Sequence, residues 1–538
     1  MRPSRLLALG ALALGAAVTP TALAGTPRTS LPPGLTVETA VHHDTSRPLS
    51  EIAKPFVVVP GHLVVENRQQ LAPARSGRAD TVRQVAATTA PRARLIANHR
   101  GLGDNYPGFT VNAIPPDTVG AVGPTQYFQW VNSGFVIIDK KSGRPLLGPS
   151  NGNAIWEDFG GECEKRNDGD PIVNYDRWAK RWVVQQFAVT DGNYQCVAVS
   201  TTSNALGRYH RYAFKYKGFN DYPKTGVWSH SYINTYNMFD AEAGPKVCAL
   251  ERAAMLAGRR ARQQCAQLSV SHPALLPADA DGRLAPAGTA PAPLIALATD
   301  ALQLRSFAVS WASPSQTRLS APATLRVAPF DSACLGYEIG SRITSSCVPQ
   351  PGASVVGMAT SLGLDPLSDR PMFRLAWRRF AAGYEAMVVT HSVSALPSAA
   401  GIRWYELRRT GGRAWTVHQQ GTYAPDTDSR WMGSAAMDKN GGIAVGYSVS
   451  GPTTTFPGIR IAGRTARDPK GTLSRETKVV DGFGVQTTAS LLARWGDYSA
   501  MSVDPVDDCT LWYTTQYMES VGIFNWSSRI AAVRLPGC

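Results

Sequence analysis

A strand-and-turn unit that recurs about every 50 residues is the feature that most constrains the fold of this chain. Clear copies begin at Asp117, Asp170 and Asp221, which are 53 and 51 residues apart. Each copy holds short runs of Val, Ile, Tyr, Trp and Phe between turn signals, in a four-strand order. More decorated copies follow near Pro293, Asp369, Asp428 and Arg494. Tandem four-stranded units of about this length are typical of β-propeller blades.

We therefore predict an all-β, seven-bladed β-propeller, with six blades as the alternative count. The 49 Gly and 38 Pro fit a chain that is rich in turns and poor in long helices. Helix is expected only in a small helical and loop insertion, which starts with the Ala, Leu and Arg-rich stretch from Val247 to Gln267. The last unit supplies three strand-like runs, so its fourth strand is expected from the N-terminal side.

Composition divides the chain into three parts. Residues 1–24 have the pattern of a secretory signal, with Arg2 and Arg5, an apolar run from Leu6 to Val18 and a small-residue ending at Ala24. Residues 25–100 form a basic Pro/Ala-rich arm, and residues 101–538 form the propeller. No second apolar run is long enough to cross a bilayer. We predict a secreted or periplasmic monomer without a transmembrane segment.

Eight cysteines follow the signal, and an even number in an exported chain predicts disulfides. Pairing each cysteine with its neighbour in the sequence would close local loops, although spacing does not fix the connectivity. None of them has the spacing of a zinc site. The pairs in that order are Cys163 with Cys196, Cys248 with Cys265, Cys334 with Cys347 and Cys509 with Cys538.

The net charge of +14 is weak support for a nucleic-acid partner. Arg2 and Arg5 leave with the signal, and the arm alone carries ten Arg or Lys against five Asp or Glu. The remaining excess is spread over more than 400 residues, without a block of like charges. We expect no specific nucleic-acid partner, and an anion-binding hypothesis would rest on net charge alone.

A series of aspartates is expected at one mouth of the central channel. Asp117, Asp170, Asp221 and Asp497 each lie six or seven residues before the first turn of a unit. Because the connections between blades share one face, these side chains should ring that face. Other polar residues occupy related positions and join the set as binding candidates: Asp369, Asp428, Arg374, Arg430, Arg494 and His391.

Converging carboxylates suit three kinds of chemistry. They bind a cation such as calcium, hydrogen-bond a sugar, or act as acid and nucleophile on a glycosidic bond. Asp170 and Asp497 are the catalytic candidates, and calcium is the cofactor to test. The competing interpretation is structural: each Asp would accept hydrogen bonds at a strand start, and His391 would be a packed residue.

The segments RWGDYSAMSVDPVDDCTLWYT, DGDPIVNYDRWAKRWVVQQFA and DYPKTGVW resemble a group of exported bacterial β-propeller proteins. That group is distantly similar to the sialidase and BNR-repeat superfamily, and the resemblance runs from about Asp117 to Cys538. It implies the fold and no established reaction. The Asp-box of sialidases is absent, whereas Arg374, Arg430 and Arg494 would supply the three arginines of a sialidase-like carboxylate site.

The functional hypothesis is an exported propeller that binds an extracellular or surface polymer, with carbohydrate favoured. Glycoside hydrolysis is the enzymatic version, and a non-catalytic adhesion or protein-interaction scaffold is the alternative. Tryptophans beside the Asp positions suit stacking on sugar rings, although core packing is their competing role. They are Trp130, Trp228, Trp431 and Trp495.

Overall fold

The computed structural model describes residues 31–58, 64–65, 78–86, 88–334, 337–339, 342–344, 346–352, 363–396, 399–487 and 494–538. The predicted signal at 1–24 lies outside the described residues. The described chain is all-β, as predicted, and none of its helices is long and apolar enough to cross a membrane. The helices are short: α1 (Leu49–Ile52), α2 (Gly161–Lys165), α3 (Arg252–Leu256), and the 3-10 turns η1 (Gly152–Trp156), η2 (Asp240–Glu242) and η3 (Pro314–Gln316).

The strands group in chain order into antiparallel sheets, which we name after their first strand in that order. The β7 sheet comprises β7 (Val119–Val122), β8 (Gln126–Val131), β9 (Gly134–Asp139) and β10 (Pro145–Asn151). The β11 sheet comprises β11 (Gly169–Asp176), β12 (Arg181–Ala188), β13 (Asn193–Ser200) and β14 (Tyr209–Tyr216). The β15 sheet comprises β15 (Asn220–Val227), β16 (Ser231–Met238), β17 (Gly244–Glu251) and β18 (Arg262–Gln267).

Two further groups are joined by parallel pairing of β19 and β26, in which Ala278 faces Leu375. The β19 group comprises β19 (Leu276–Asp281), β20 (Ala292–Ala298), β21 (Ala301–Ala308), β22 (Arg318–Leu319) and β23 (Ala323–Arg326). The β26 group comprises β26 (Leu375–Arg379), β27 (Tyr384–Leu396), β28 (Ala399–Thr410) and β29 (Thr416–Tyr423).

Two four-stranded sheets complete the series. The β30 sheet comprises β30 (Ser429–Met437), β31 (Ile443–Ser450), β32 (Gly458–Arg464) and β33 (Thr477–Val480). The β34 sheet comprises β34 (Ala500–Val503), β35 (Leu511–Met518), β36 (Trp526–Arg534) and β5 (Arg94–Gly101). Two isolated strand pairs are β3 (Val64–Val65) with β6 (Ala113–Ile114), and β24 (Tyr337–Ile339) with β25 (Arg342–Thr344).

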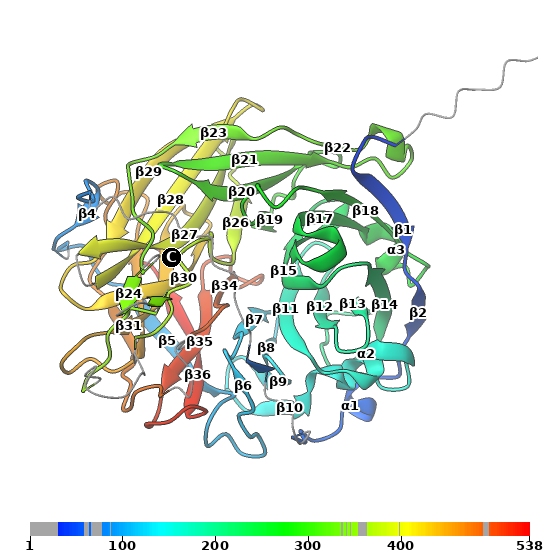
Figure 1. Cartoon of the computed structure of the whole chain (residues 1–538), viewed down its shortest axis with the longest axis horizontal. Helices are drawn as coiled ribbons and strands as arrows, with labels where there is room; N and C mark the ends of the chain where they lie inside the picture. The colour runs from blue at the N-terminus through cyan, green and yellow to red at the C-terminus, as the bar shows by residue number, and fades with distance from the viewer. Residues whose placement is uncertain are drawn as a thin grey trace, which may run out of the picture.

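The first strands of these sheets follow one another in a circular order. The contacts run from β7 through β11, β15, β19, β26, β30 and β34, and β34 contacts β7 again. Figure 1 shows the sheets arranged around a common centre. The starts of β7, β11, β15 and β34 lie together, because the Asp117 N–H bonds the Gly496 backbone oxygen, Tyr222 bonds that of Asp497, and Tyr498 bonds Asp170. We call this end of the arrangement the strand-start end.

Several described segments of the N-terminal arm pair with the sheets. β5 pairs with β36 along its length, with Asn98 facing Ala531, and supplies the expected fourth strand of the last sheet. β1 (Leu35–Thr39) pairs with β18, and β2 (His42–Thr45) pairs with β14, which extends two sheets to five strands. β4 (Arg83–Gln84) runs parallel to β29.

The expected helical insertion is the part of the sequence interpretation that the structure corrects. The stretch from Val247 to Gln267 holds most of β17, all of β18 and only the short α3. Cys248 faces Cys265 across these two strands, and β17 also pairs with β16. Cross-strand pairing and burial therefore override the helix propensity of the Ala and Leu residues in this stretch.

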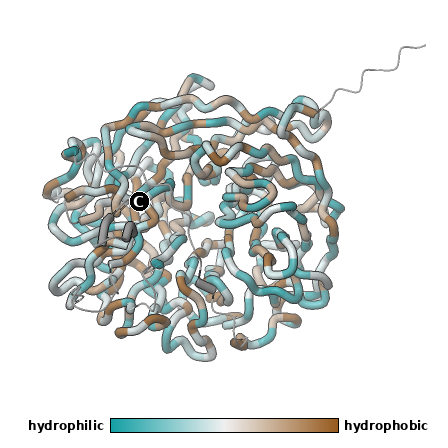
Figure 2. The backbone as a smooth tube through the Cα atoms, in the orientation of Figure 1, coloured by the Kyte–Doolittle hydropathy of each residue, from teal (hydrophilic) through white to brown (hydrophobic). Residues whose placement is uncertain are grey.

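Aromatic side chains fill the spaces between the sheets. Trp130, Trp228, Trp431 and Trp495 are fully buried, and the rings of Trp431 and Trp495 lie 5.6 Å apart. Core packing, and not sugar stacking, is therefore their role in this structure. Figure 2 shows hydrophobic segments in the sheets on all sides of the molecule.

The eight cysteines pair with their sequence neighbours. The disulfides join Cys163 to Cys196, Cys248 to Cys265, Cys334 to Cys347 and Cys509 to Cys538.

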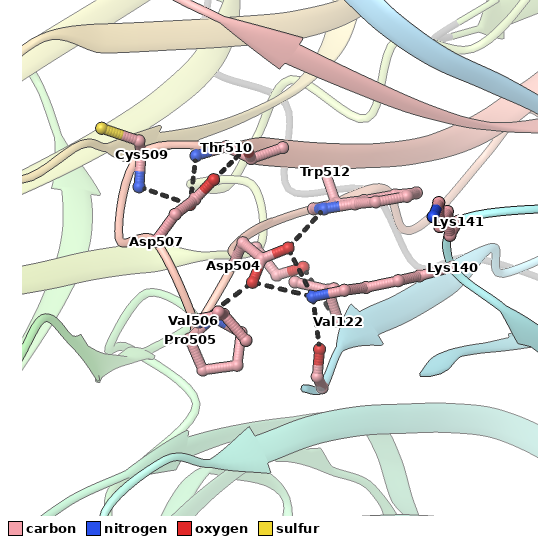
Figure 3. A network of polar contacts seen from close by, with 12 residues as sticks. Val122, Lys140, Lys141, Asp504, Pro505, Val506, Asp507, Cys509, Thr510 and Trp512 are labelled. Atoms are coloured by element: carbon pink, nitrogen blue, oxygen red, sulfur yellow. Dashed lines mark hydrogen bonds and ion pairs between the residues drawn. The ribbon is translucent and has the colours of Figure 1, made fainter. Parts of the chain in front are cut away.

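The turn between β34 and β35 is held by its own aspartates (Figure 3). Asp504 accepts hydrogen bonds from Trp512 Nε1 at 3.2 Å and from Lys140 Nζ at 2.7 and 2.9 Å. Lys140 follows β9, so this ion pair links the last sheet to the β7 sheet. Asp507 accepts bonds from the backbone N–H groups of Cys509 and Thr510, both at 2.9 Å, and from the Thr510 hydroxyl at 2.6 Å.

The Asp507→Asn variant should lose stability in a pH-dependent way. Burial alone would raise the pKa of Asp507, but hydrogen bonds from Thr510, Cys509 and Arg534 lower it from 3.8 to about 2. The folded-state pKa is the lower one, so the stabilisation is present above about pH 4 and disappears as the pH falls toward 2. Since the side chain is 29% exposed, we expect a deficit of about 1 kcal/mol at pH 7.

Urea unfolding of wild type and variant between pH 7 and pH 2.5 measures this difference. The deficit should shrink below pH 4. The Val533→Ala variant, which opens a cavity and removes no titrating group, should keep a constant deficit. A constant deficit for Asp507→Asn would contradict the assignment.

Candidate binding site at the strand-start end

The backbone conformation at the starts of the first strands explains why aspartates recur there. The chain adopts a left-handed conformation just before the regular pairing of five first strands, with φ values between 48° and 58°. Asp and Asn tolerate this conformation better than most residues, because their short polar side chains bond locally. In the third unit the left-handed residue is Tyr222, next to the predicted Asp221. The five positions are Asp117, Asp170, Tyr222, Met432 and Asp497.

The three left-handed aspartates are buried and bonded. Asp117 accepts a hydrogen bond from Asn132 Nδ2 at 2.7 Å, and Asp170 accepts one from the Tyr498 hydroxyl at 2.8 Å. Asp497 pairs with Arg494. The exposed fractions of Asp117, Asp170 and Asp497 are 0%, 1% and 3%. The two catalytic candidates, Asp170 and Asp497, are therefore held by protein groups away from solvent.

Lys224 lies at the centre of these residues. Its Nζ is 2.9 Å from the ring centroid of Tyr222 and 3.5 Å from that of Tyr498. The Tyr222 hydroxyl donates to the backbone oxygen of Asp497 at 2.9 Å, and the Tyr498 hydroxyl also donates to that of Pro223 at 3.2 Å. An amine between two aromatic faces is a favourable cation–π arrangement. These contacts connect the β15 sheet to the β11 and β34 sheets.

Burial and the nearby carboxylates shift the pKa of the Lys224 amine in opposite directions. Burial lowers the pKa of the Lys224 amine well below its ordinary value, and Arg370 lowers it further, whereas Asp170, Asp497 and Asp221 raise it. Burial also raises the pKa of Tyr498 well above 10, and the charges of Asp170 and Asp117 add to that effect. Tyr498 therefore stays a neutral hydrogen-bond donor to Asp170.

The accessible part of the cluster consists of Asp221, Asp369 and Arg370. Asp221 is half-buried. Arg370 bonds Asp369 through two nitrogens, at 2.8 and 3.0 Å, and its guanidinium lies 4.5 Å from the Tyr222 ring centroid. The side chains of Asp369 and Arg370 are 19% and 11% exposed. We name the whole group the strand-start cluster: Asp117, Asp170, Asp221, Tyr222, Lys224, Asp369, Arg370, Arg494, Asp497 and Tyr498.

The other two arginines of the expected trio form contacts of their own. Arg374 bonds Asp279 and Asp281, which lie on β19. Arg430 bonds Asp426 and Glu476, both at 2.7 Å. Arg494 pairs with Asp497. Each of the three arginines therefore bonds carboxylates that the other two do not, so the guanidinium groups do not share one anion site.

His391 and Asp428 also form separate contacts. His391 is buried, its Nε2 lies 2.9 Å from the Tyr405 hydroxyl, and its ring centroid is 4.6 Å from that of Phe330. Burial lowers the pKa of His391 well below 6.5, and Arg403 adds to this. The imidazole is thus a neutral, packed group. Asp428 accepts a hydrogen bond from Thr455 at 2.6 Å.

Sequence reasoning missed Tyr222, Lys224, Arg370 and Tyr498. One signal was visible: an Asp-Tyr pair occurs both at Asp221 and at Asp497. The described residues contain no group of three or more His, Cys, Asp or Glu side chains that would hold a metal ion.

No protein-family model and no curated protein matches this chain. Solved structures that are similar to it include an α-L-arabinofuranosidase from Fusarium graminearum, at 9% identity and a TM-score of 0.36, over 82% of this chain and 99% of the other. An α-L-arabinanase from Penicillium chrysogenum matches at 9% identity and a TM-score of 0.33, over 84% and 99%. A subtype N10 neuraminidase-like protein of A/little yellow-shouldered bat/Guatemala matches at 8% identity and 0.28, over 81% and 99%. The function proposed below rests on the contacts within this chain.

The Lys224→Met variant should lose about 3 kcal/mol of stability, because Asp170 and Asp497 lose the amine that lies near them. Denaturant unfolding at pH 7 measures the loss. The control Tyr222→Phe keeps the ring and removes only the hydroxyl bond to Asp497, so it should cost about 1 kcal/mol. Wild-type stability of Lys224→Met would show that the cluster does not depend on this amine.

Proposed function

We propose that this protein is a secreted, monomeric seven-bladed β-propeller that binds an extracellular polymer, with carbohydrate as the favoured ligand, at the strand-start cluster. The observation that carries the proposal is the convergence of charged and aromatic side chains from several sheets around Lys224. Buried ionisable groups are costly, and clusters of them are more frequent at functional sites than elsewhere.

The blade count rests on the first strands. Each begins a sheet or group of at least four strands, and their contacts return from β34 to β7. The pairing of β36 with β5 and the ion pair of Lys140 with Asp504 support a closed ring. Export rests on the predicted signal at 1–24 and agrees with the four disulfides.

Binding is favoured over glycosidic cleavage by the burial of Asp170 and Asp497. A glycosidase needs two carboxyl groups that flank the scissile bond, and in this structure both are engaged by Tyr498 and Arg494. A polymer would instead meet Asp221, Asp369 and Arg370, which offer acceptors and donors for sugar hydroxyls. The same burial favours a non-catalytic protein-interaction scaffold as the second candidate function.

A glycan array followed by titration of the retained polysaccharide tests the proposal. The Asp369→Asn and Asp221→Asn variants should each weaken binding about 3- to 10-fold, since each alters hydrogen bonds to the ligand. The control Asp158→Asn makes the same charge change at an exposed carboxylate outside the cluster and should bind like wild type.

Three results would revise the proposal. Absence of binding to any glycan would favour the protein-interaction scaffold. Unchanged affinity in both cluster variants would move the site elsewhere on the molecule. Release of reducing sugars that stops in Asp170→Asn or Asp497→Asn would make the protein a glycoside hydrolase.

A further inference from the structure

Phe483 is the most exposed of the large hydrophobic side chains in the described part of the chain, at 69%, and the only aromatic one among them. It follows β33, in a segment that pairs in parallel with the loop after β35, where Gln486 faces Gly522. That loop carries Val521, which is 61% exposed. Single exposed apolar residues are common on proteins, so the question is whether the chain holds this ring in a defined place.

The backbone on both sides of Phe483 is tightly held. The Phe483 N–H donates to the backbone oxygen of Met518 at 2.9 Å, and the Met518 N–H donates to that of Pro457 at 3.0 Å. A Cβ atom at Gly482 would overlap the Pro457 oxygen, and one at Gly484 would overlap backbone atoms of the loop after β35. Only glycine allows backbones this close. The two glycines therefore fix Phe483 and place no side chain of their own beside its ring.

The segment that carries Phe483 continues into the strand-start cluster. Three residues further on, Gln486 Nε2 donates to the backbone oxygen of Arg494, a member of the cluster, at 2.6 Å. The side-chain oxygen of Gln516 on β35 accepts a bond from the Gly496 N–H at 2.8 Å, and Phe483 is held two residues further along the same strand. Two residues of a strand span about 7 Å, so Phe483 is anchored close to the residues that begin the β34 sheet.

Charged side chains lie near Phe483 in the chain and in space. Asp481, two residues before it, bonds Lys478 at 2.6 Å, and these side chains are 42% and 64% exposed. Glu519, which follows the residue that accepts the Phe483 N–H, bonds Arg100 at 3.0 Å, and these are 29% and 40% exposed. The surroundings of the ring thus offer hydrogen-bond donors and acceptors that solvent reaches.

This combination fits a sugar ring better than a protein surface. A sugar presents an apolar C–H face that an aromatic ring covers, and hydroxyl groups at its edge that bond polar neighbours. A stable protein interface buries about 800 Å² on each partner around an apolar centre. Phe483 and Val521 alone do not supply such a centre.

We propose that Phe483 is an aromatic platform on which one sugar ring of the extracellular polymer stacks, beside the strand-start cluster. The inference rests on the proposed function and extends it, because the polymer would contact both Phe483 and the exposed pair of Asp369 and Arg370. It also supplies a stacking residue at this end of the molecule, a role that the buried tryptophans do not fill.

Calorimetric titration with the polysaccharide that the glycan array retains tests the proposal. Phe483→Ala should weaken binding about 5- to 10-fold. Phe483→Leu, which is apolar without a ring, should be equally weak, whereas Phe483→Trp keeps an aromatic face and should bind about as tightly as wild type. The melting temperatures should stay equal, because the side chain is exposed. The control Val506→Ala removes a side chain that is 59% exposed from the turn after β34 and should bind like wild type.

The Phe483→Trp variant also reports contact with the ring directly. Its added tryptophan should be quenched by acrylamide in the free protein and shielded when the polysaccharide is bound, in excess of any change in wild type.

The failures of the two proposals have different signatures. Wild-type affinity of Phe483→Ala, together with weakened binding by Asp369→Asn, would overturn the platform and leave the proposed function intact. Full affinity of Phe483→Leu, or unchanged quenching in Phe483→Trp, would overturn stacking. Retention of no glycan by the wild-type protein would overturn both proposals and favour a protein partner at this surface.

Discussion

The pairing of β36 with β5 is the constraint on which the other contacts depend. It places residues 94–101 and 526–534 in one sheet, although more than 400 residues separate them in the chain. The contacts of β34 with β7 follow from it, as does the ion pair between Lys140 and Asp504. Non-local pairing of this kind is slow to form, since a long loop must close before any contact stabilises it. The disulfide from Cys509 to Cys538 lies in the same sheet region and restricts its opening.

The repeat made most strands predictable from the sequence. The main error of the sequence prediction, a helix at 247–267, is explained by tertiary pairing. Runs such as Gln126–Val131 and Leu511–Met518 carry their strand signal in β-branched and aromatic residues. The stretch at 247–267 carries Ala, Leu and Arg instead, and only its pairing partners and the Cys248–Cys265 disulfide make it a hairpin. The strands of the arm were equally hard to predict, because β1 and β2 lie at sheet edges and are strands only through their pairing with β18 and β14.

The sequence predicts where three aspartates of the candidate site lie along the chain, but not their contacts. Asp117, Asp170 and Asp497 lie at or just before the starts of β7, β11 and β34. Their spacing did not reveal the left-handed backbone that these residues adopt, or that Asn132, Tyr498 and Arg494 bond them. Lys224 carries no sequence signal of its own, since its importance comes from two tyrosines that lie on separate sheets. Arg374 illustrates the same limit, because its partners Asp279 and Asp281 belong to another unit.

Two groups of polar side chains lie among the first strands. One surrounds Lys224 and includes the partly exposed Asp369 and Arg370, and the other surrounds the buried Arg374. Hydrogen–deuterium exchange of the full chain, with and without the polysaccharide retained on the array, tests polymer binding at the first group most directly. Ligand-dependent protection should concentrate in residues 220–227, 369–374 and 494–499. Protection confined to other segments, with these three unchanged, would contradict the proposed site.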